Sequence, residues 1–516
     1  MSVTYSTGSG TPITITTFNY GETASLTATP NAGFSFVNWT KNNVVVSTNA
    51  SYSFTVTGAG NYVANFAYAA DAAISENTTL PSLYLNPNVR LTIKSGVTLA
   101  VTGAITEASG AKIVIEDGGQ LINNTPNVNA IVEKDITKWV ESSRYGWHAI
   151  STPVRNVTFA NVANLTSSAY NVYRLNETNL LWENSQDGSN VYSRMQNGHG
   201  YLYRKGDNAA IEFNGTLNVD TVHYALSYTS PSTKGFHLIG NPYPHNIYKG
   251  VNAAIPNTYL EEGFYTLTLA GGWIAGNDHS TPITPCQGVV VQAKNTVANN
   301  HLVITKTAAT GAKRDYDNNI MFTVSNSNYE DVAYAVMKEG HGLNKIEHRN
   351  DEIPMLYIQH NGEDFAIANI GDDVTAFNLN FRAATMGRYT MNVKTDGDFS
   401  YLHLIDAVTG EDIDMLIDEE YSFIGAPSDK ENRFIVKLDY NTSVSSTGSE
   451  SFAYQNGNDL MVSGEGELQI FDVTGRLVMK QSVNGVGSVS TSSLQTGVYI
   501  LRLIGADVKT QKIVVK

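Results

Sequence analysis

Short runs in which apolar and polar residues alternate recur along this chain of 516 residues. Residues 52–56, 89–93 and 377–381 are clear examples, each with an apolar side chain at every second position. Such a period is typical of a strand with one face in a core and the other in water. Gly, Asn, Asp and Pro residues separate the runs, as they do at turns. The pattern therefore predicts an all-β protein.

The composition excludes several classes of partner. The formal net charge is −15, and charged residues make up only 16% of the chain without a dense cluster of Lys or Arg. Nucleic acids and anionic membranes attract clustered cations, so neither is expected as a partner. No apolar run approaches the roughly 20 residues of a membrane-spanning helix, so no transmembrane segment is expected. Because a single core does not extend over so long a chain, several domains are predicted.

Residues 451–516 carry the most distinctive sequence motifs. They include Leu-Gln-Ile-Phe-Asp-Val-Thr-Gly-Arg at 468–476, Leu-Gln-Thr-Gly-Val-Tyr-Ile-Leu-Arg at 494–502, and Lys-Ile-Val-Val-Lys at 512–516. Apolar side chains at every second position of 499–503 share one face of a strand. These features predict a compact β-sandwich of short strands joined by Gly-containing turns.

The same motifs closely resemble the C-terminal sorting domain of type IX secretion in Bacteroidetes-type bacteria. The resemblance implies an Ig-like domain that the outer-membrane translocon recognises and a sorting peptidase removes. The remaining protein would pass through the periplasm and then be joined to surface lipopolysaccharide at the outer membrane or be released. It would thus be secreted or displayed at the cell surface. The sorting signal is assigned to Gly475, Leu494, Gly497, Tyr499, Lys512 and Lys516.

The N-terminal region, residues 1–68, is predicted to be a separate β module. Turn residues at 30–33 precede Phe-Ser-Phe-Val-Asn-Trp at 34–39, and Tyr-Val-Ala-Asn-Phe follows at 62–66. This series resembles the internalin-type B repeat, which is a small β-grasp-like module of bacterial surface proteins. Trp39 could be an exposed ligand platform, but in so small a module we interpret it as the main aromatic core residue. Because Met1-Ser-Val-Thr-Tyr-Ser lacks the pattern of a signal peptide, we expect a leader upstream of it.

Four further regions are predicted between these two ends. Short strands at near-regular spacing in residues 69–133 predict a β-helix-like spacer that packs on a neighbour. Residues 134–308 and 309–440 are predicted to be two β-sandwich domains, similar to regions found upstream of type IX sorting domains. The polar residues 441–450 are predicted to be a linker to the tail.

A short motif occurs twice within residues 134–308, and we call the two copies the echoed motif. Gly-Trp-His-Ala-Ile at 146–150 recurs as Gly-Phe-His-Leu-Ile at 235–239, and a proline follows shortly after each copy. A catalytic histidine duplicated by repetition would be unusual. His148 and His237 are therefore interpreted as strand residues with satisfied hydrogen bonds.

Signatures of catalysis and metal binding are missing. The sequence has no zinc-protease helix, no phosphate loop and no nucleophile elbow. His341, Glu347 and His348 lack a known ligand spacing, and residues 315–326 lack the Gly and Glu of a calcium loop. The acidic residues of 411–420 are interpreted as solvated turns rather than paired catalytic carboxylates or a Ca²⁺ site.

The single cysteine, Cys286, excludes an intramolecular disulfide and a metal site built from several thiolates. No cysteine-protease signature surrounds it, so we interpret it as a small apolar filler at a strand start. Together with the missing signatures, this predicts a protein without catalytic residues, cofactor or metal.

Trp182, Tyr243 and Trp273 are candidates for a glycan-stacking face, although their spacing does not separate that role from core packing. The predicted function is that of a non-catalytic surface protein exported by type IX secretion and serving in adhesion or envelope structure. Two alternatives stay open. One is a carbohydrate-binding surface protein with a host or matrix ligand, and the other is the accessory region of an enzyme whose catalytic domain lies upstream.

Overall fold

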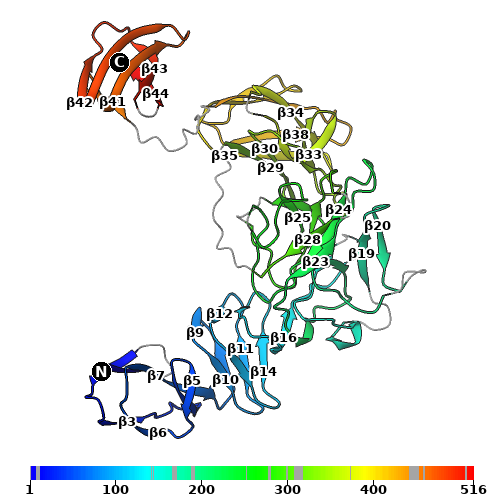
Figure 1. Ribbon diagram of the computed structural model, residues 1–516. Helices are drawn as coiled ribbons and strands as arrows, with labels where there is room; N and C mark the ends of the chain where they lie inside the picture. The colour runs from blue at the N-terminus through cyan, green and yellow to red at the C-terminus, as the bar shows by residue number, and fades with distance from the viewer. Residues whose placement is uncertain are drawn as a thin grey trace. The chain divides into compact units, whose positions relative to one another are not determined.

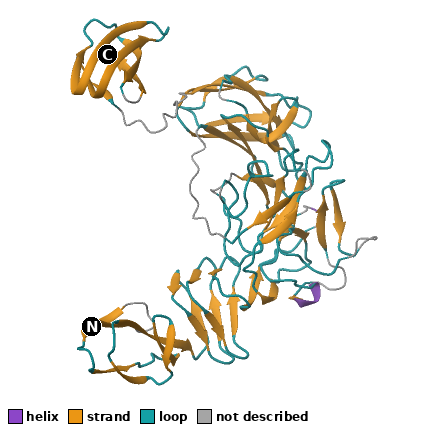
Figure 2. Cartoon of the chain, viewed as in Figure 1, coloured by secondary structure: helices purple, strands orange, loops and turns teal. Residues whose placement is uncertain are grey.

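The computed structural model describes residues 2–6, 12–140, 142, 145–165, 171–186, 192–251, 253–276, 281–297, 300–306, 318–371, 373–440, 452–456, 459–505 and 508–515. Strands dominate these residues (Figure 1, Figure 2), and the 3-10 turn η2 (Phe159–Asn161) is a short exception. The prediction of an all-β protein with several modules is confirmed. The chain divides into two compact units, residues 1–440 and 441–516, which are described separately.

The N-terminal module contains one mixed sheet and one separate pair of strands. Strand β7 pairs with β1 and β4, β1 also pairs with β2, and β4 pairs with β5, while β3 pairs with β6. The strands are β1 (Ser2–Ser6), β2 (Pro12–Thr17), β3 (Thr23–Thr27), β4 (Phe34–Lys41), β5 (Val44–Ser47), β6 (Ser51–Thr55) and β7 (Gly60–Tyr68). Trp39 is 1% exposed among Leu26, Tyr62 and Ala64, and its indole N–H donates to the Ala50 carbonyl at 3.1 Å. Trp39 is therefore a core residue, as predicted.

A short stack of parallel strands follows. Its sheets are β8-β11-β14-β16, β9-β12-β15 and β7-β10-β13. The strands are β8 (Ala72–Ile74), β9 (Thr78–Leu80), β10 (Leu83–Leu85), β11 (Arg90–Ile93), β12 (Thr98–Val101), β13 (Ile105–Glu107), β14 (Lys112–Ile115), β15 (Gln120–Ile122) and β16 (Asn129–Lys134). So few rungs need neighbours to complete their core. Here β10 continues the sheet of β7 at one end, and β16 pairs with β22 at the other.

The middle of the larger unit contains two four-stranded antiparallel sheets, β17-β21-β19-β20 and β24-β27-β25-β26, and the pair β23–β28. Strands β18 and β22 join the sheet of β16. The bounds are β17 (His148–Ile150), β18 (Val162–Ala163), β19 (Val172–Asn176), β20 (Leu181–Asn184), β21 (Tyr201–Tyr203), β22 (Ile211–Thr216), β23 (Val222–Ala225), β24 (Phe236–Gly240), β25 (Phe264–Leu267), β26 (Trp273–Gly276), β27 (Gly288–Gln292) and β28 (His301–Ile304). The echoed motif lies on β17 and β24, so each copy supplies a strand to a different sheet.

The last part of the larger unit is a sheet in the order β37-β36-β39-β34-β32-β33-β30-β29-β35-β38, with β31 paired to β33. Its strands are β29 (Asn319–Ser325), β30 (Glu330–Val336), β31 (Gly342–Asn344), β32 (Met355–His360), β33 (Glu363–Asn369), β34 (Ala376–Arg382), β35 (Gly387–Asp396), β36 (Phe399–Asp406), β37 (Asp412–Asp414), β38 (Glu420–Gly425) and β39 (Phe434–Tyr440). One hydrophobic cluster joins it to the middle sheets, because Tyr265 and Trp273 pack with Tyr334 and Ile367.

The second unit is a small sandwich built around one long strand. Strand β41 pairs with β42 along most of its length, and also with β40 near its start and β43 near its end. The strands are β40 (Ala453–Asn456), β41 (Asp459–Asp472), β42 (Leu477–Ser490), β43 (Gly497–Ile504) and β44 (Val508–Val515). Leu468, Ile470 and Leu501 are at most 1% exposed in its core.

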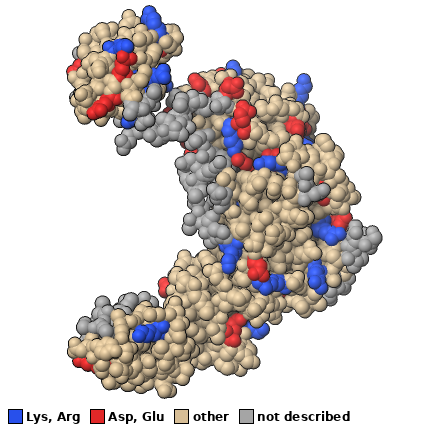
Figure 3. Space-filling view, in the orientation of Figure 1, with Lys and Arg blue, Asp and Glu red and all other residues tan. Residues whose placement is uncertain are grey.

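Charged side chains are scattered over the face drawn in Figure 3, without a broad basic patch. Among the described residues, no helix has the length and apolar character needed to cross a membrane.

Candidate functional site

The turn between β41 and β42 is stabilised by hydrogen bonds to the carboxylate of Asp472. Asp472 Oδ1 accepts hydrogen bonds from the Thr474 hydroxyl at 2.6 Å and from the Thr474 and Arg476 backbone N–H groups at 3.0 and 3.1 Å. These bonds favour the charged carboxylate, with the Thr474 hydroxyl contributing most, and they lower the pKa of Asp472 to about 2. Gly475 has a φ of +80°, a conformation that glycine adopts without strain. The Thr-Gly motif of the sequence is therefore a tight hairpin turn.

Leu494, Gly497 and Tyr499 build the entry into β43. The Leu494 backbone N–H donates to the Thr491 carbonyl at 2.8 Å, and its side chain packs against the core of the module. Tyr499 is 7% exposed, and its hydroxyl donates to the Gln495 carbonyl at 2.8 Å. The ring thus fills the core while the hydroxyl closes the loop that precedes the strand.

The predicted sorting residues that are described gather around β43. Asp472 pairs with Tyr499 across β41 and β43, so the Gly475 turn adjoins the start of β43. Lys512 on β44 pairs with Ile500 on β43 and is exposed to solvent. Lys516 lies outside the described residues. This end therefore presents a turn ordered by hydrogen bonds to Asp472, together with the exposed side chain of Lys512.

A groove on the larger unit collects four of the five tryptophans of the chain. It has a volume of about 490 Å³ and is open to solvent. We call it the tryptophan groove, and it is lined by Trp139, Trp147, Trp182, Arg204, Trp273, Glu347, His348 and Arg349. These residues come from the segment before β17, from β20, from the residue that follows β21, from β26 and from the loop before β32. The groove is therefore assembled from segments that lie far apart in the sequence.

The aromatic rings and guanidinium groups of the groove alternate. The Arg204 guanidinium lies 3.9 Å from the centre of the Trp139 ring and 5.1 Å from that of Trp147. Arg349 lies 4.4 Å from the Trp147 ring centre and 5.6 Å from the Trp182 ring centre. Such contacts attract the cation to the negative face of each indole. They connect the two arginines to three of the rings that line the groove.

The predicted pair Trp182 and Trp273 is brought together at one end of this groove. Their ring centres are 6.4 Å apart and the rings are parallel within 3°. Trp273 is only 3% exposed, whereas Trp182 is half-buried and keeps part of its surface open. The structure does not bring Tyr243 to them. Tyr243 is 1% exposed and its hydroxyl bonds to two backbone carbonyls, so its ring has no face open to a ligand.

Trp139, Trp147, Arg204 and Arg349 were not identified from the sequence. One signal was available, because Trp139 and Trp147 lie close together in a chain that has only five tryptophans. The two arginines gave no such signal, since isolated arginines are usually solvated.

A buried ion pair supports the floor of the groove. His348 Nδ1 accepts a hydrogen bond from the Trp273 backbone N–H at 3.1 Å, and its Nε2 lies 3.4 Å from Asp331 Oδ2. Lys345 Nζ contacts the same carboxylate at 2.5 Å. Burial alone would raise the pKa of Asp331, but the charge of Lys345 and the hydrogen bond from His348 hold it below its ordinary value. Burial lowers the pKa of Lys345.

The two echoed histidines are held by the backbone. Thr137 N–H donates to His148 Nε2 at 3.0 Å, and Ser227 N–H donates to His237 Nε2 at 3.2 Å. Burial lowers the pKa of both imidazoles. Cys286 is 1% exposed, and burial raises the pKa of its thiol well above the ordinary value. In this environment the thiolate is disfavoured, as expected for a core cysteine.

Two further histidines, His403 and His341, lie close to carboxylates. His403 Nδ1 lies 2.7 Å from Asp412 Oδ1 and its Nε2 lies 3.8 Å from Asp414 Oδ2, on the surface pair β36–β37. His341 Nδ1 lies 3.6 Å from Glu261 Oε1, and its Nε2 lies 3.6 Å from Glu363 Oε1. Residues 315–317 of the considered calcium loop lie outside the described residues. Over the part of the chain that is described, no three His, Cys, Asp or Glu side chains are grouped to hold a metal ion.

Three family models match parts of the chain, and one of them falls within the separate C-terminal unit. Residues 454–516 match the family described as secretion system C-terminal sorting domain. Residues 1–70 match the divergent InlB B-repeat domain, and residues 37–250 match a domain of unknown function (DUF8693). No curated protein matched the chain.

The first two matches confirm the resemblances drawn from the sequence motifs. The protein is type IX secretion cargo, with a B-repeat module at its N-terminal side and a sorting domain that addresses it to the cell surface.

Proposed function

We propose that the protein is a non-catalytic component of the cell surface of a Bacteroidetes-type bacterium and serves in adhesion or envelope structure. The observation that carries the proposal is the continuity of its β modules upstream of the sorting domain. The sheet of β7 continues into β10, β16 pairs with β22, and one apolar cluster joins the middle sheets to the last one. A long, internally braced array of this kind suits a protein that holds a position or a partner.

The partners follow from the sorting domain. The translocon and its sorting peptidase would act on residues 451–516, and the larger unit would then be attached to lipopolysaccharide at the outer membrane. This order of events uses the observed division between residues 440 and 441, because removal of one compact unit leaves the other intact.

The test compares cells that lack the gene with cells that carry it. We expect the deletion strain to lose attachment to a matrix-coated or abiotic surface, or to show a leaky envelope, while its growth in suspension stays normal. The control is a strain that makes the protein without residues 451–516, which should not restore the lost property. Normal attachment together with a normal envelope in the deletion strain would overturn the proposal.

Carbohydrate binding is the second candidate function. The observation that favours it is the tryptophan groove, in which Trp182 and Trp139 are half-buried and retain exposed ring surface.

A further inference from the structure

The tryptophan groove combines flat apolar surfaces with fixed positive charge. Four indole rings and two guanidinium groups form a series of contacts along it, with an arginine between Trp139 and Trp147, an arginine between Trp147 and Trp182, and Trp273 stacked on Trp182. Its volume of about 490 Å³ lies within the range of ligand sites in proteins. Because the contacts between rings and cations already order these side chains, binding would cost little conformational entropy.

The charge of the groove is opposite in sign to the net charge of the chain. The protein has a net charge of −15, yet Arg204 and Arg349 both line this one groove. Glu347 is its only acidic lining residue among those described, and that carboxylate is paired with Arg382 outside the groove. Asp331 lies beneath the floor and is matched by Lys345. The groove is therefore a local cationic site on an acidic protein, and it would select an anionic ligand.

We propose that the tryptophan groove binds an anionic saccharide. The exposed parts of Trp139 and Trp182 would lie against the apolar faces of sugar rings. The guanidinium groups of Arg204 and Arg349 would pair with carboxylate or sulfate groups, whose geometry matches their forked N–H donors. Because the groove is open to solvent, it would accommodate an extended oligosaccharide. This inference deepens the proposed function and rests on it for the location of the ligand outside the cell.

The experiment titrates the full chain with three oligosaccharides of equal length, followed by calorimetry and by tryptophan emission. The probes are oligogalacturonate, a heparin-derived oligosaccharide and a neutral cello-oligosaccharide. We expect saturable binding of at least one acidic probe, at least about tenfold tighter than the neutral one and weakened by salt. The carboxylated and sulfated probes distinguish the two sources of negative charge.

Two pairs of variants separate contact with the ligand from general damage to the fold. Trp182→Ala should weaken binding of the acidic probe about tenfold, and Trp182→Phe should restore most of it, because phenylalanine keeps a flat ring. Arg204→Gln should weaken binding about tenfold and reduce the salt dependence. Arg204→Lys, which keeps the charge and loses the fork, should fall between Arg204→Gln and the natural chain.

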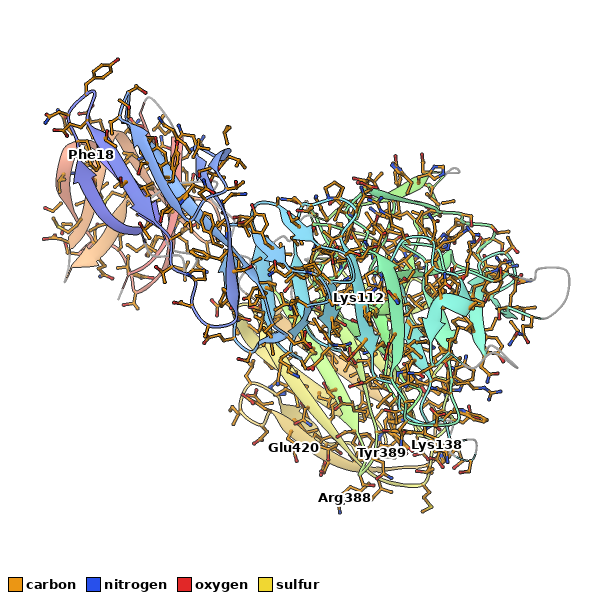
Figure 4. All side chains as sticks on the ribbon, turned by 90° about the horizontal axis from the view of Figure 1, so that it is seen from below. Phe18, Lys112, Lys138, Arg388, Tyr389 and Glu420 are labelled. Carbon is orange, nitrogen blue, oxygen red and sulfur yellow. The ribbon has the colours of Figure 1, made fainter. Side chains whose placement is uncertain are left out.

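Matched controls come from the same unit. Tyr401 is 38% exposed on β36 and Arg388 is exposed on β35, where it projects outward (Figure 4). Tyr401→Ala and Arg388→Gln should leave binding unchanged. Each variant is checked by its thermal transition, so that loss of binding in an unfolded protein is not counted.

Two results would overturn the inference. One is the absence of saturable binding of both acidic probes, and the other is equal affinity for the neutral probe. Unchanged affinity in folded Trp182→Ala and Arg204→Gln would equally place the binding elsewhere. None of these results alters the attachment of cells that carry the natural gene, so failure here is distinct from failure of the proposed function.

Discussion

The sorting domain and the tryptophan groove are assembled in opposite ways. The sorting domain is one continuous segment whose strands are sequence neighbours or pair through β41. The groove draws its rings and cations from five segments between Trp139 and Arg349. A continuous module can be removed without loss to the rest. A site built from distant segments depends on the whole unit, so its function and the stability of that unit are tied together.

The largest expected effect is on export. Deletion of residues 451–516 should abolish display at the cell surface almost completely, since no other segment carries the sorting motifs. The remaining unit should keep its thermal transition. Cell fractionation and protease treatment of intact cells measure display, and calorimetry of the purified fragment measures the transition. Normal display of the truncated protein would contradict the assignment.

The next effect concerns the floor of the groove. Asp331→Asn leaves the buried Lys345 ammonium without its partner and should lower the free energy of unfolding of the larger unit by about 3–5 kcal/mol. Denaturant titration measures it. Asp412→Asn is the matched control, because it breaks a surface contact with His403 and should cost less than about 1 kcal/mol. Equal effects of the two substitutions would show that the ion pair beneath the groove has no structural role.

The two units should also differ in how their stability responds to pH. All 11 histidines lie in the larger unit, and burial lowers the pKa of His199 there to about 4. The unfolded chain, with a histidine pKa near 6.5, binds the proton more readily than the folded one. Stability is therefore fully present above about pH 6.5 and decreases as the pH falls toward 4, by an amount on the order of 2 kcal/mol for His199.

The measurement for this prediction is the free energy of unfolding of each unit between pH 7 and pH 4. His199→Gln should flatten the curve of the larger unit, and the smaller unit should show no histidine-dependent change. A slope that is the same in the natural chain and in His199→Gln would assign the acid sensitivity to other groups.

The smallest effect is local to the sorting domain. Tyr499→Phe removes the hydrogen bond to the Gln495 carbonyl while keeping the ring in the core, so it should cost about 1 kcal/mol. Only the transition of the smaller unit should shift. A shift in the larger unit would mean that the two units are coupled, and the contrast between them would then be weaker than we infer.

Much of the architecture could be predicted from local patterns. Alternation of apolar residues identified strands, and Gly475 and the Tyr499 region marked the turns and strand entry of the sorting domain. These features act between sequence neighbours, so their physics is visible in a short window. The core position of Trp39 followed in the same way from the small size of its module.

The proposed glycan site was only partly predicted. Trp182 and Trp273 do pack together, but Tyr243 lies in the core, where its hydroxyl is within hydrogen-bonding distance of two backbone carbonyls. Its aromatic character gave no information about burial. Arg204 and Arg349 were missed because an arginine gains a special role only from the rings on either side of it.

Local pattern therefore accounts for the strands, the turns and the exported destination, since each of these depends on residues close together in the chain. The tryptophan groove depends on which sheets pack together. That packing is set by the apolar cluster of Tyr265, Trp273, Tyr334 and Ile367, whose members are separated by up to about a hundred residues. Only the folded arrangement places four tryptophans and two arginines along one groove.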